Sequence, residues 1–295
     1  MAPNAPAESG ELPISLGTCA WSYDDWRSVF YPDHLPATER LQFYARHFST
    51  VEVDSTFYHP PAAHVTAHWA EVVPEDFRFS LKLPREITHE RKLRDSQEPL
   101  ETFCEGIQPL QGKLASVLIQ LPPYFEPKQD EHALRDFIRH LPKDFRFAVE
   151  FRDPAWHTPR IAHLLEEHAV CWAWNDVTTL DHAVEAAFGF WPQTTDFIYL
   201  RLLGDLDSKY HPLTGERVHQ YQRVMWSREN ALSNWTEKLR SILPHVKHAL
   251  VYCANHFEGL APATAVRLGK KLGLPLELPS SEEMRGQDPN QLALF

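Results

Sequence analysis

Eight short apolar runs alternate with amphipathic segments along nearly the whole chain, and this alternation limits the fold more than any other feature. Each run has the length of a strand and is rich in β-branched or aromatic residues. Their starts recur at intervals of roughly 30 residues, the usual size of one βα unit. The runs span residues 14–21, 50–57, 77–83, 116–122, 145–152, 170–176, 197–203 and 249–256.

The segments between these runs have helical periodicity, as in Leu41, Tyr44, Ala45 and Phe48. The predicted helices span 38–48, 63–72, 98–110, 131–140, 159–168, 229–243 and 262–272, and the pattern is weaker at 180–188. Eight strands that are each followed by a helix predict a single (β/α)8 TIM barrel. A doubly wound open sheet is the alternative, but the first run ends without the glycine-rich turn typical of that fold.

The predicted barrel occupies residues 13–278. A disordered lead at 1–12 precedes it, and a polar, flexible tail at 279–295 follows it. Residues 204–228 form a long predicted loop beyond the seventh strand, and such loops often cover the mouth of a barrel.

Side chains of a barrel strand alternate between the interior and the surrounding helices. In the third run, Ser80 and Lys82 share the face opposite to Phe79 and Leu81, so Lys82 is predicted to point into the mouth. Glu52 and Asp54 alternate with valines in the same way. The predicted ring at the C-terminal ends of the strands comprises Glu52, Lys82, Gln120, Glu150, Arg152, Arg201 and Asn255.

Burying unpaired charge is costly, so these groups must pair with one another, bind a ligand, or do both. A purely structural ion-pair network is one interpretation. A ligand site is favoured, because barrel enzymes place their sites at this end. Glu52 and Glu150 are the predicted general acid or base, and Lys82 is the third catalytic candidate. Arg152 and Arg201 are predicted to bind an anion, together with Gln120 and Asn255.

Aromatic side chains follow several strands and suit stacking on a sugar ring or a base. The candidates for such ligand contacts are Trp21, Tyr23, Tyr58 and Tyr210. A divalent metal is compatible with the carboxylates and His256, but it is not favoured, because lysine and arginine in the ring compete with a cation. The cofactor therefore stays unknown.

The net charge of −11 argues against a broad nucleic-acid surface, although it leaves room for a local basic cleft. No apolar run is long enough to span a bilayer, and the N-terminus does not read as a secretory signal, so no membrane partner is expected. The four cysteines are too far apart in sequence for a metal knuckle or a redox pair. Reduced, buried cysteines and a cytoplasmic location are predicted.

Several long motifs occur in a family-specific order: GTCAWSYDDWRSVFYP, FRFSLKLPREITH, LIQLPPYF, FAVEFRDPAWH and FIYLRLLG. From about Ile14 to Leu274 the chain resembles the family called domain of unknown function 72, the YecE-like proteins. The resemblance implies a TIM barrel with no established activity, similar to the barrels of sugar isomerases and abasic-site endonucleases. All seven residues of the predicted ring fit the family pattern. Asp54 and Ala254 depart from it, so no role is transferred to these two.

The last five residues resemble the peptide with which bacterial DNA polymerases and repair proteins bind the sliding clamp. Leu294 and Phe295 would be its apolar anchors, supported by Leu292, and Gln291 would supply a directional hydrogen bond. Packing of this hydrophobic end on the barrel is the alternative.

Three functions stay open at this point. The first is an enzyme, a hydrolase, lyase or isomerase, acting at the mouth on an anionic sugar, sugar phosphate or nucleic-acid-derived ligand. The second is a clamp-recruited nuclease or DNA-binding factor associated with DNA repair. The third is a binding barrel without chemistry.

Overall fold

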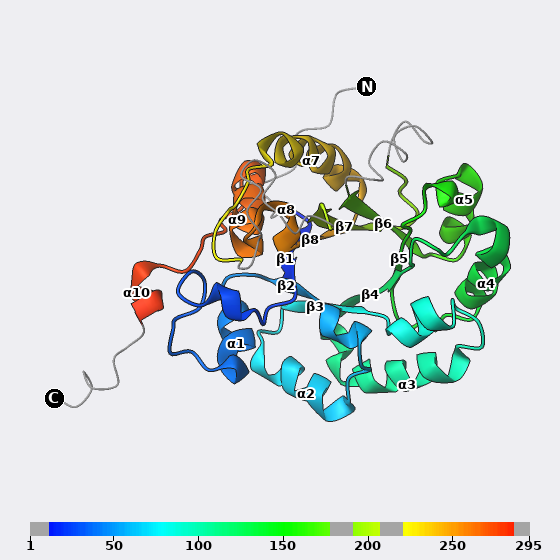
Figure 1. Cartoon of the computed structure of the whole chain (residues 1–295), viewed down its shortest axis with the longest axis horizontal. Helices are drawn as coiled ribbons and strands as arrows, with labels where there is room; N and C mark the ends of the chain where they lie inside the picture. The colour runs from blue at the N-terminus through cyan, green and yellow to red at the C-terminus, as the bar shows by residue number, and fades with distance from the viewer. Residues whose placement is uncertain (1–11, 178–190, 207–220, 286–295) are drawn as a thin grey trace, which may run out of the picture.

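The computed structural model describes residues 12–177, 191–206 and 221–285. Eight parallel strands form a closed barrel in sequence order, with β8 paired to β1. The ring of strands lies at the centre of the molecule with helices outside it (Figure 1). The strands are β1 Ile14–Cys19, β2 Thr50–Val53, β3 Arg78–Lys82, β4 Leu114–Gln120, β5 Phe147–Glu150, β6 Cys171–Val177, β7 Phe197–Gly204 and β8 His248–Cys253. The predicted (β/α)8 barrel is confirmed.

The longer helices of the described chain lie between consecutive strands or, for the last of them, after β8, as the sequence pattern predicts. They are α2 Ala63–Val72, α3 Gln97–Ile107, α4 Pro127–Arg139, α5 Pro159–Glu167, α7 Glu229–Ile242 and α9 Ala261–Leu272. Shorter ones are α1 Arg40–Tyr44, α8 Asn255–Glu258 and α10 Ser281–Arg285. None of the helices in the described ranges combines the length and apolar composition that crossing a bilayer requires. The predicted helix at 180–188 lies outside the described residues.

Six strands end earlier than the apolar pattern predicts, and the difference is largest in the second and the eighth. The second gives way at Asp54 to a 3-10 turn, Asp54–Phe57, and the eighth ends at Cys253 before helix α8. In both places the chain turns across the barrel mouth directly after the last ladder pair. The predicted bounds 50–57 and 249–256 were therefore too long, because apolar composition alone does not distinguish a strand end from a tight turn.

Two separate sets of buried side chains stabilise the barrel. One set, including Phe79, Leu81 and Val149, faces the helices and forms the large outer core. The other, including Leu118, Ala148 and Tyr252, consists of alternate strand residues and fills the interior. Burying each large apolar side chain contributes roughly 1.5–3 kcal/mol.

Gly17 sets the spacing between β1 and β2. It pairs with Thr50 in the ladder, and a Cβ at this position would lie 2.0 Å from the Thr50 carbonyl oxygen. A side chain here would collide with backbone that cannot move aside. Glycine is therefore required for the barrel to close at this seam.

Candidate functional site

Arg201 on β7 holds together the charged groups at the C-terminal ends of the strands. Its Nη1 donates to Glu150 Oε2 at 2.5 Å, and its Nη2 donates to Glu52 Oε1 at 2.7 Å. Nε donates to the same Glu52 oxygen at 3.1 Å. The Arg201 side chain is 3% exposed and both carboxylates are 0% exposed. Three strands on different sides of the barrel are thus joined by one buried guanidinium.

The two glutamates have opposite electrostatic environments. Burial raises the pKa of Glu52, and Arg201 opposes that shift only in part. For Glu150 burial also acts to raise the pKa, but Arg152 and Arg201 outweigh it and lower the pKa below its usual value. Arg152 Nε binds Glu150 directly, while Glu52 accepts a 2.5 Å hydrogen bond from the Tyr199 hydroxyl. Different pKa values for neighbouring carboxyls are a common feature of acid–base sites.

Asp54 lies closer to solvent than the two glutamates. It follows β2 directly and begins the 3-10 turn, and its side chain is 34% exposed. Its Oδ1 stands 3.6 Å from Arg201 Nη2, and this buried oxygen accepts no hydrogen bond from the described residues. Asp54 therefore has acceptor capacity that the protein itself does not use.

Lys82 ends β3 and extends its ammonium over the face of Phe57, 4.0 Å from the ring centroid. Within the described ranges it forms no ion pair and no hydrogen bond through its side chain. Burial lowers its pKa, and the nearby Asp54 charge opposes this shift. A cation in such a position lacks the partner that normally offsets desolvation.

His89 is a further residue of the mouth, and it is absent from the ring predicted by strand alternation. It lies in the π-turn Glu86–Glu90 that follows β3, and its ring centroid is 4.9 Å from that of Phe57. Burial first, and then the positive charge of Lys82, lower its pKa to about 4. The ring is therefore neutral at physiological pH. Two features could have indicated that His89 belongs to the site. It is the last residue of the FRFSLKLPREITH motif, and π-turns tend to occur at functional sites.

The predicted amide ligands are largely engaged within the protein. Gln120 donates from Nε2 to the carbonyl of Leu121 at 2.7 Å. Asn255 Oδ1 accepts from Trp26 Nε1 at 3.2 Å and from the backbone NH of Ala261 at 3.0 Å. Its buried Nδ2 has no partner among the described residues. Asn255 thus fixes the turn between α8 and α9, and its amide nitrogen is what it can still offer a ligand.

Of the four aromatic residues predicted to contact a ligand, three lie among the described residues. Trp21 packs edge-on against Trp69, with ring centroids 5.4 Å apart. Burial of Tyr23, and then the charge of the nearby Asp54, raise the pKa of the Tyr23 hydroxyl well above its usual range. Tyr58 is exposed and packs edge-on against Phe57. Tyr210 and the tail residues Gln291, Leu292, Leu294 and Phe295 lie outside the described residues, so their roles stay predictions.

Three ligand atoms from Cys19, Glu52 and Asp54 lie within 4.8 Å of one another, which raises the question of a metal. This donor set suits a cation poorly. Both oxygens of Glu52 already accept hydrogen bonds from Arg201 and Tyr199. Burial, reinforced by Glu52, also raises the pKa of Cys19, so the residue is a thiol rather than the thiolate that binds metals. We therefore assign no metal to these three residues.

Comparison with known proteins gives both curated and structural relatives. The Escherichia coli K12 protein named UPF0759 protein YecE is 33% identical over 141 residues, which cover 48% of this chain and 49% of that protein. The Bacillus subtilis UPF0759 protein YunF is 32% identical over 152 residues, or 50% of this chain and 53% of that protein. The matched segment spans about half the length of these curated relatives.

Solved structures extend the similarity to most of the chain. A DUF72 family protein from Thermotoga maritima is 26% identical with a TM-score of 0.70, covering 88% of this chain and 99% of that one. A DUF72 family protein from Enterococcus faecalis, 24% identical with a TM-score of 0.70, shares the fold over 91% of this chain and 99% of that one. Residues 15–288 match the family described as Protein of unknown function DUF72, and the chain belongs to this family.

Proposed function

We propose that this protein is an enzyme that binds a small anionic ligand at the barrel mouth and transfers a proton to or from it. The ligand class is a sugar phosphate or a nucleotide-derived phosphate. One observation carries the proposal: the Lys82 ammonium stacks on Phe57 but has no ion-pair or hydrogen-bond partner among the described residues, beside charges that are bonded to one another. Leaving a largely buried cation unpaired is costly, and an anionic ligand would offset that cost.

The electrostatics of Lys82 suit it to proton transfer. Its lowered pKa increases the share of neutral amine at physiological pH, and a neutral amine can accept a proton. The neutral ring of His89 borders the same Phe57 wall and offers a second group for moving a proton. Asp54 Oδ1, which faces Arg201 but accepts no hydrogen bond from the described residues, can accept one from a ligand hydroxyl.

The arginines would stabilise negative charge that develops on the ligand. Arg152 is the better placed of the two, because its side chain is 12% exposed whereas that of Arg201 is 3% exposed. We assign Glu52 and Glu150 to holding these guanidiniums in place. This assignment differs from the acid–base role that their sequence positions predicted, because neither carboxylate is exposed.

Deuterium exchange tests this proposal even while the product is unidentified. The protein is incubated in D₂O with a panel of sugar phosphates and nucleoside phosphates, and loss of carbon-bound proton signals is followed by NMR. We expect exchange with at least one compound, which Lys82→Met abolishes. Lys128→Met, which removes an exposed lysine on α4, is the matched control. Full exchange by Lys82→Met, an equal loss in Lys128→Met, or no exchange with any compound would contradict proton transfer by Lys82.

A further inference from the structure

A second set of basic side chains lies at the opposite, N-terminal end of the barrel. Arg78 begins β3, Arg146 precedes β5 and His248 begins β8. Each shares the parity of residues that face the interior, such as Ser80 and Tyr252, so all three turn toward the opening between the strands. With Ser15 of β1 they line a cavity of about 480 Å³.

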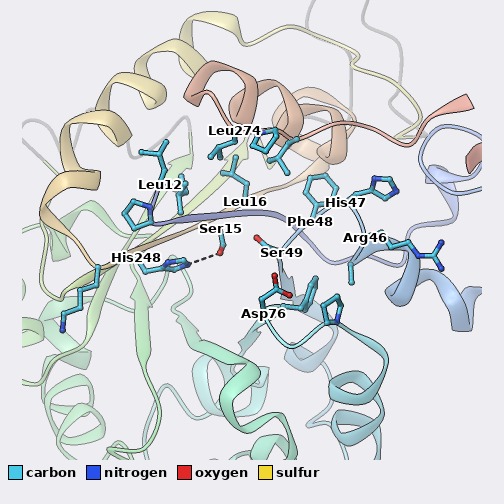
Figure 2. A pocket seen from close by; sticks show the side chains of 18 residues that line it. Leu12, Ser15, Leu16, Arg46, His47, Phe48, Ser49, Asp76, His248 and Leu274 are labelled. Atoms are coloured by element: carbon cyan, nitrogen blue, oxygen red, sulfur yellow. Dashed lines mark hydrogen bonds between the residues drawn. The ribbon is translucent and has the colours of Figure 1, made fainter. Parts of the chain in front are cut away.

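A neighbouring cavity of about 570 Å³ shares Ser15, Asp76 and His248 with the first. Figure 2 shows the side chains of Ser15 and His248 joined by a hydrogen bond, with Asp76 and Ser49 also lining this cavity. Each of these volumes lies within the range of roughly 300–1,000 Å³ that is typical of sites for small organic ligands rather than single ions.

The positive charge at this end is not neutralised by the protein. Across the described ranges, neither Arg78 nor Arg146 forms an ion pair. Arg78 Nη1 donates to the carbonyls of Glu75 and Phe77 at 2.7 and 3.0 Å. The Arg146 guanidinium lies 5.5 Å from the centroid of the Phe197 ring. Asp76 is the lining carboxylate, and it is exposed at the rim without an ion pair to either arginine.

His248 shows how close these charges are. Its Nε2 is 3.0 Å from the Ser15 hydroxyl, so its Nδ1 is available to a ligand. Burial lowers its pKa, and the charges of Arg146 and Arg78 lower it further. Both guanidiniums are thus near the imidazole, and three groups that repel one another when charged gather around one cavity. An oxyanion placed among them would receive hydrogen bonds from the guanidiniums and from either the imidazole or the Ser15 hydroxyl, because the neutral ring and the hydroxyl already share one hydrogen bond.

We propose that this cavity, which we call the polar-end site (Ser15, Arg78, Arg146 and His248), binds the phosphate group of a small phosphorylated molecule. The site is separate from the mouth, because the fully buried side chains of Leu118, Tyr199 and Tyr252 fill the interior between them. It does not depend on the proposed chemistry at Lys82.

Isothermal titration calorimetry tests the polar-end site, with inorganic phosphate and glucose 6-phosphate as probes and sodium chloride holding ionic strength constant. Replacing a charged hydrogen-bond donor to phosphate typically costs tenfold or more, so Arg146→Gln is expected to weaken binding of the ester by about tenfold. Arg78→Gln should also weaken binding of the ester. Lys143→Gln is the matched control, because this exposed lysine lies three residues before Arg146 and does not line the cavity.

The double variant Lys82→Met with Arg152→Gln removes the two less buried cations of the mouth, leaves Arg201 bound to Glu52 and Glu150, and separates the two sites. Binding that survives in this variant and is lost in Arg146→Gln supports the polar-end site. Tighter binding of the ester than of inorganic phosphate supports an organic ligand, and equal binding would overturn that part of the proposal. Unchanged affinity in Arg146→Gln, or an equal loss in Lys143→Gln, would overturn the site itself. Circular dichroism of each variant establishes that it is folded.

Discussion

Replacement of Arg201 by methionine tests how the buried charges of the mouth contribute to stability. The substitution removes three hydrogen bonds to two carboxylates that have no exposed surface. Breaking a buried ion pair from one side costs roughly 3–5 kcal/mol, because the remaining charge stays desolvated. Glu52 keeps Tyr199 as a donor and Glu150 keeps Arg152, so we expect a loss near the lower end, about 3 kcal/mol.

The loss should depend on pH in a definite direction. Without Arg201, the lowering effect of the guanidinium on Glu52 is lost and only the Tyr199 hydrogen bond still opposes burial, so the Glu52 pKa rises further above the value of about 4.3 in the unfolded chain. A carboxyl whose pKa is raised in the folded state contributes stability below the unfolded pKa and loses it as pH rises through the folded pKa. In the unsubstituted protein the lowered pKa of Glu150 contributes stability that is lost as pH falls. The deficit of Arg201→Met is therefore expected to be larger at pH 8 than at pH 5.

Urea unfolding followed by tryptophan fluorescence at both pH values measures the deficit. Arg160→Met is the control, because Arg160 also pairs twice with one carboxylate, Glu131, but is well exposed and its loss should cost little. Adding Glu52→Gln to Arg201→Met should recover part of the stability by removing one orphaned charge. A deficit no larger than that of Arg160→Met, or one that is equal at pH 5 and pH 8, would refute the reasoning.

Three further predictions concern the barrel seam, a buried histidine and the tail. Gly17→Ala should abolish folding, because the new Cβ meets the Thr50 carbonyl, whereas Gly112→Ala has open space and should be neutral; soluble yield and thermal unfolding compare them. Burial lowers the pKa of His157 to about 4, below its unfolded value, so NMR titration should show a neutral ring at pH 5, and stability should fall as pH drops from about 6.5 toward 4; a ring that titrates near 6.5 would contradict this. A peptide of residues 286–295 should bind a bacterial sliding clamp in fluorescence polarisation, and loss of binding on replacing Leu294 and Phe295 by alanine would support the tail motif, while no binding would exclude it.

Strand alternation carries much of the information about which side chains enter the mouth. In β3 the apolar residues Phe79 and Leu81 are fully buried toward the helices, and this leaves Lys82 on the interior face. Alternation does not indicate which residues these side chains bind. Arg201 joins Glu52 and Glu150 because of the barrel register, which sets how high each strand end lies around the ring. Because Arg201 binds the two glutamates, Asp54 Oδ1 is left without a hydrogen bond and Lys82 without an ion pair among the described residues, and the sequence could not indicate this.

Other residues escaped prediction for local reasons. Asn175 and Asp176 of β6 lie in a strand whose residues are all buried, so its composition shows no polar face. Asp176 accepts from Arg228 and Trp235 and secures the outside of the barrel. Asn255 was predicted as part of the ring, but it begins a helix, so strand parity does not determine its direction. His89 lies in a π-turn that no short-range pattern predicts.

The interior residue Tyr252 connects strands that the backbone hydrogen bonds between neighbouring strands do not join. From β8 its hydroxyl reaches across Gly17 of β1 and hydrogen-bonds with Thr50 of β2 at 2.9 Å and Ser80 of β3 at 2.8 Å. The seam between the first and last strands is thus cross-linked from inside, so it cannot open by separating a single strand pair. Strands β1, β2, β3 and β8 are therefore expected to unfold as one cooperative unit. Their backbone amides should exchange hydrogen together, at the slowest rate in the molecule.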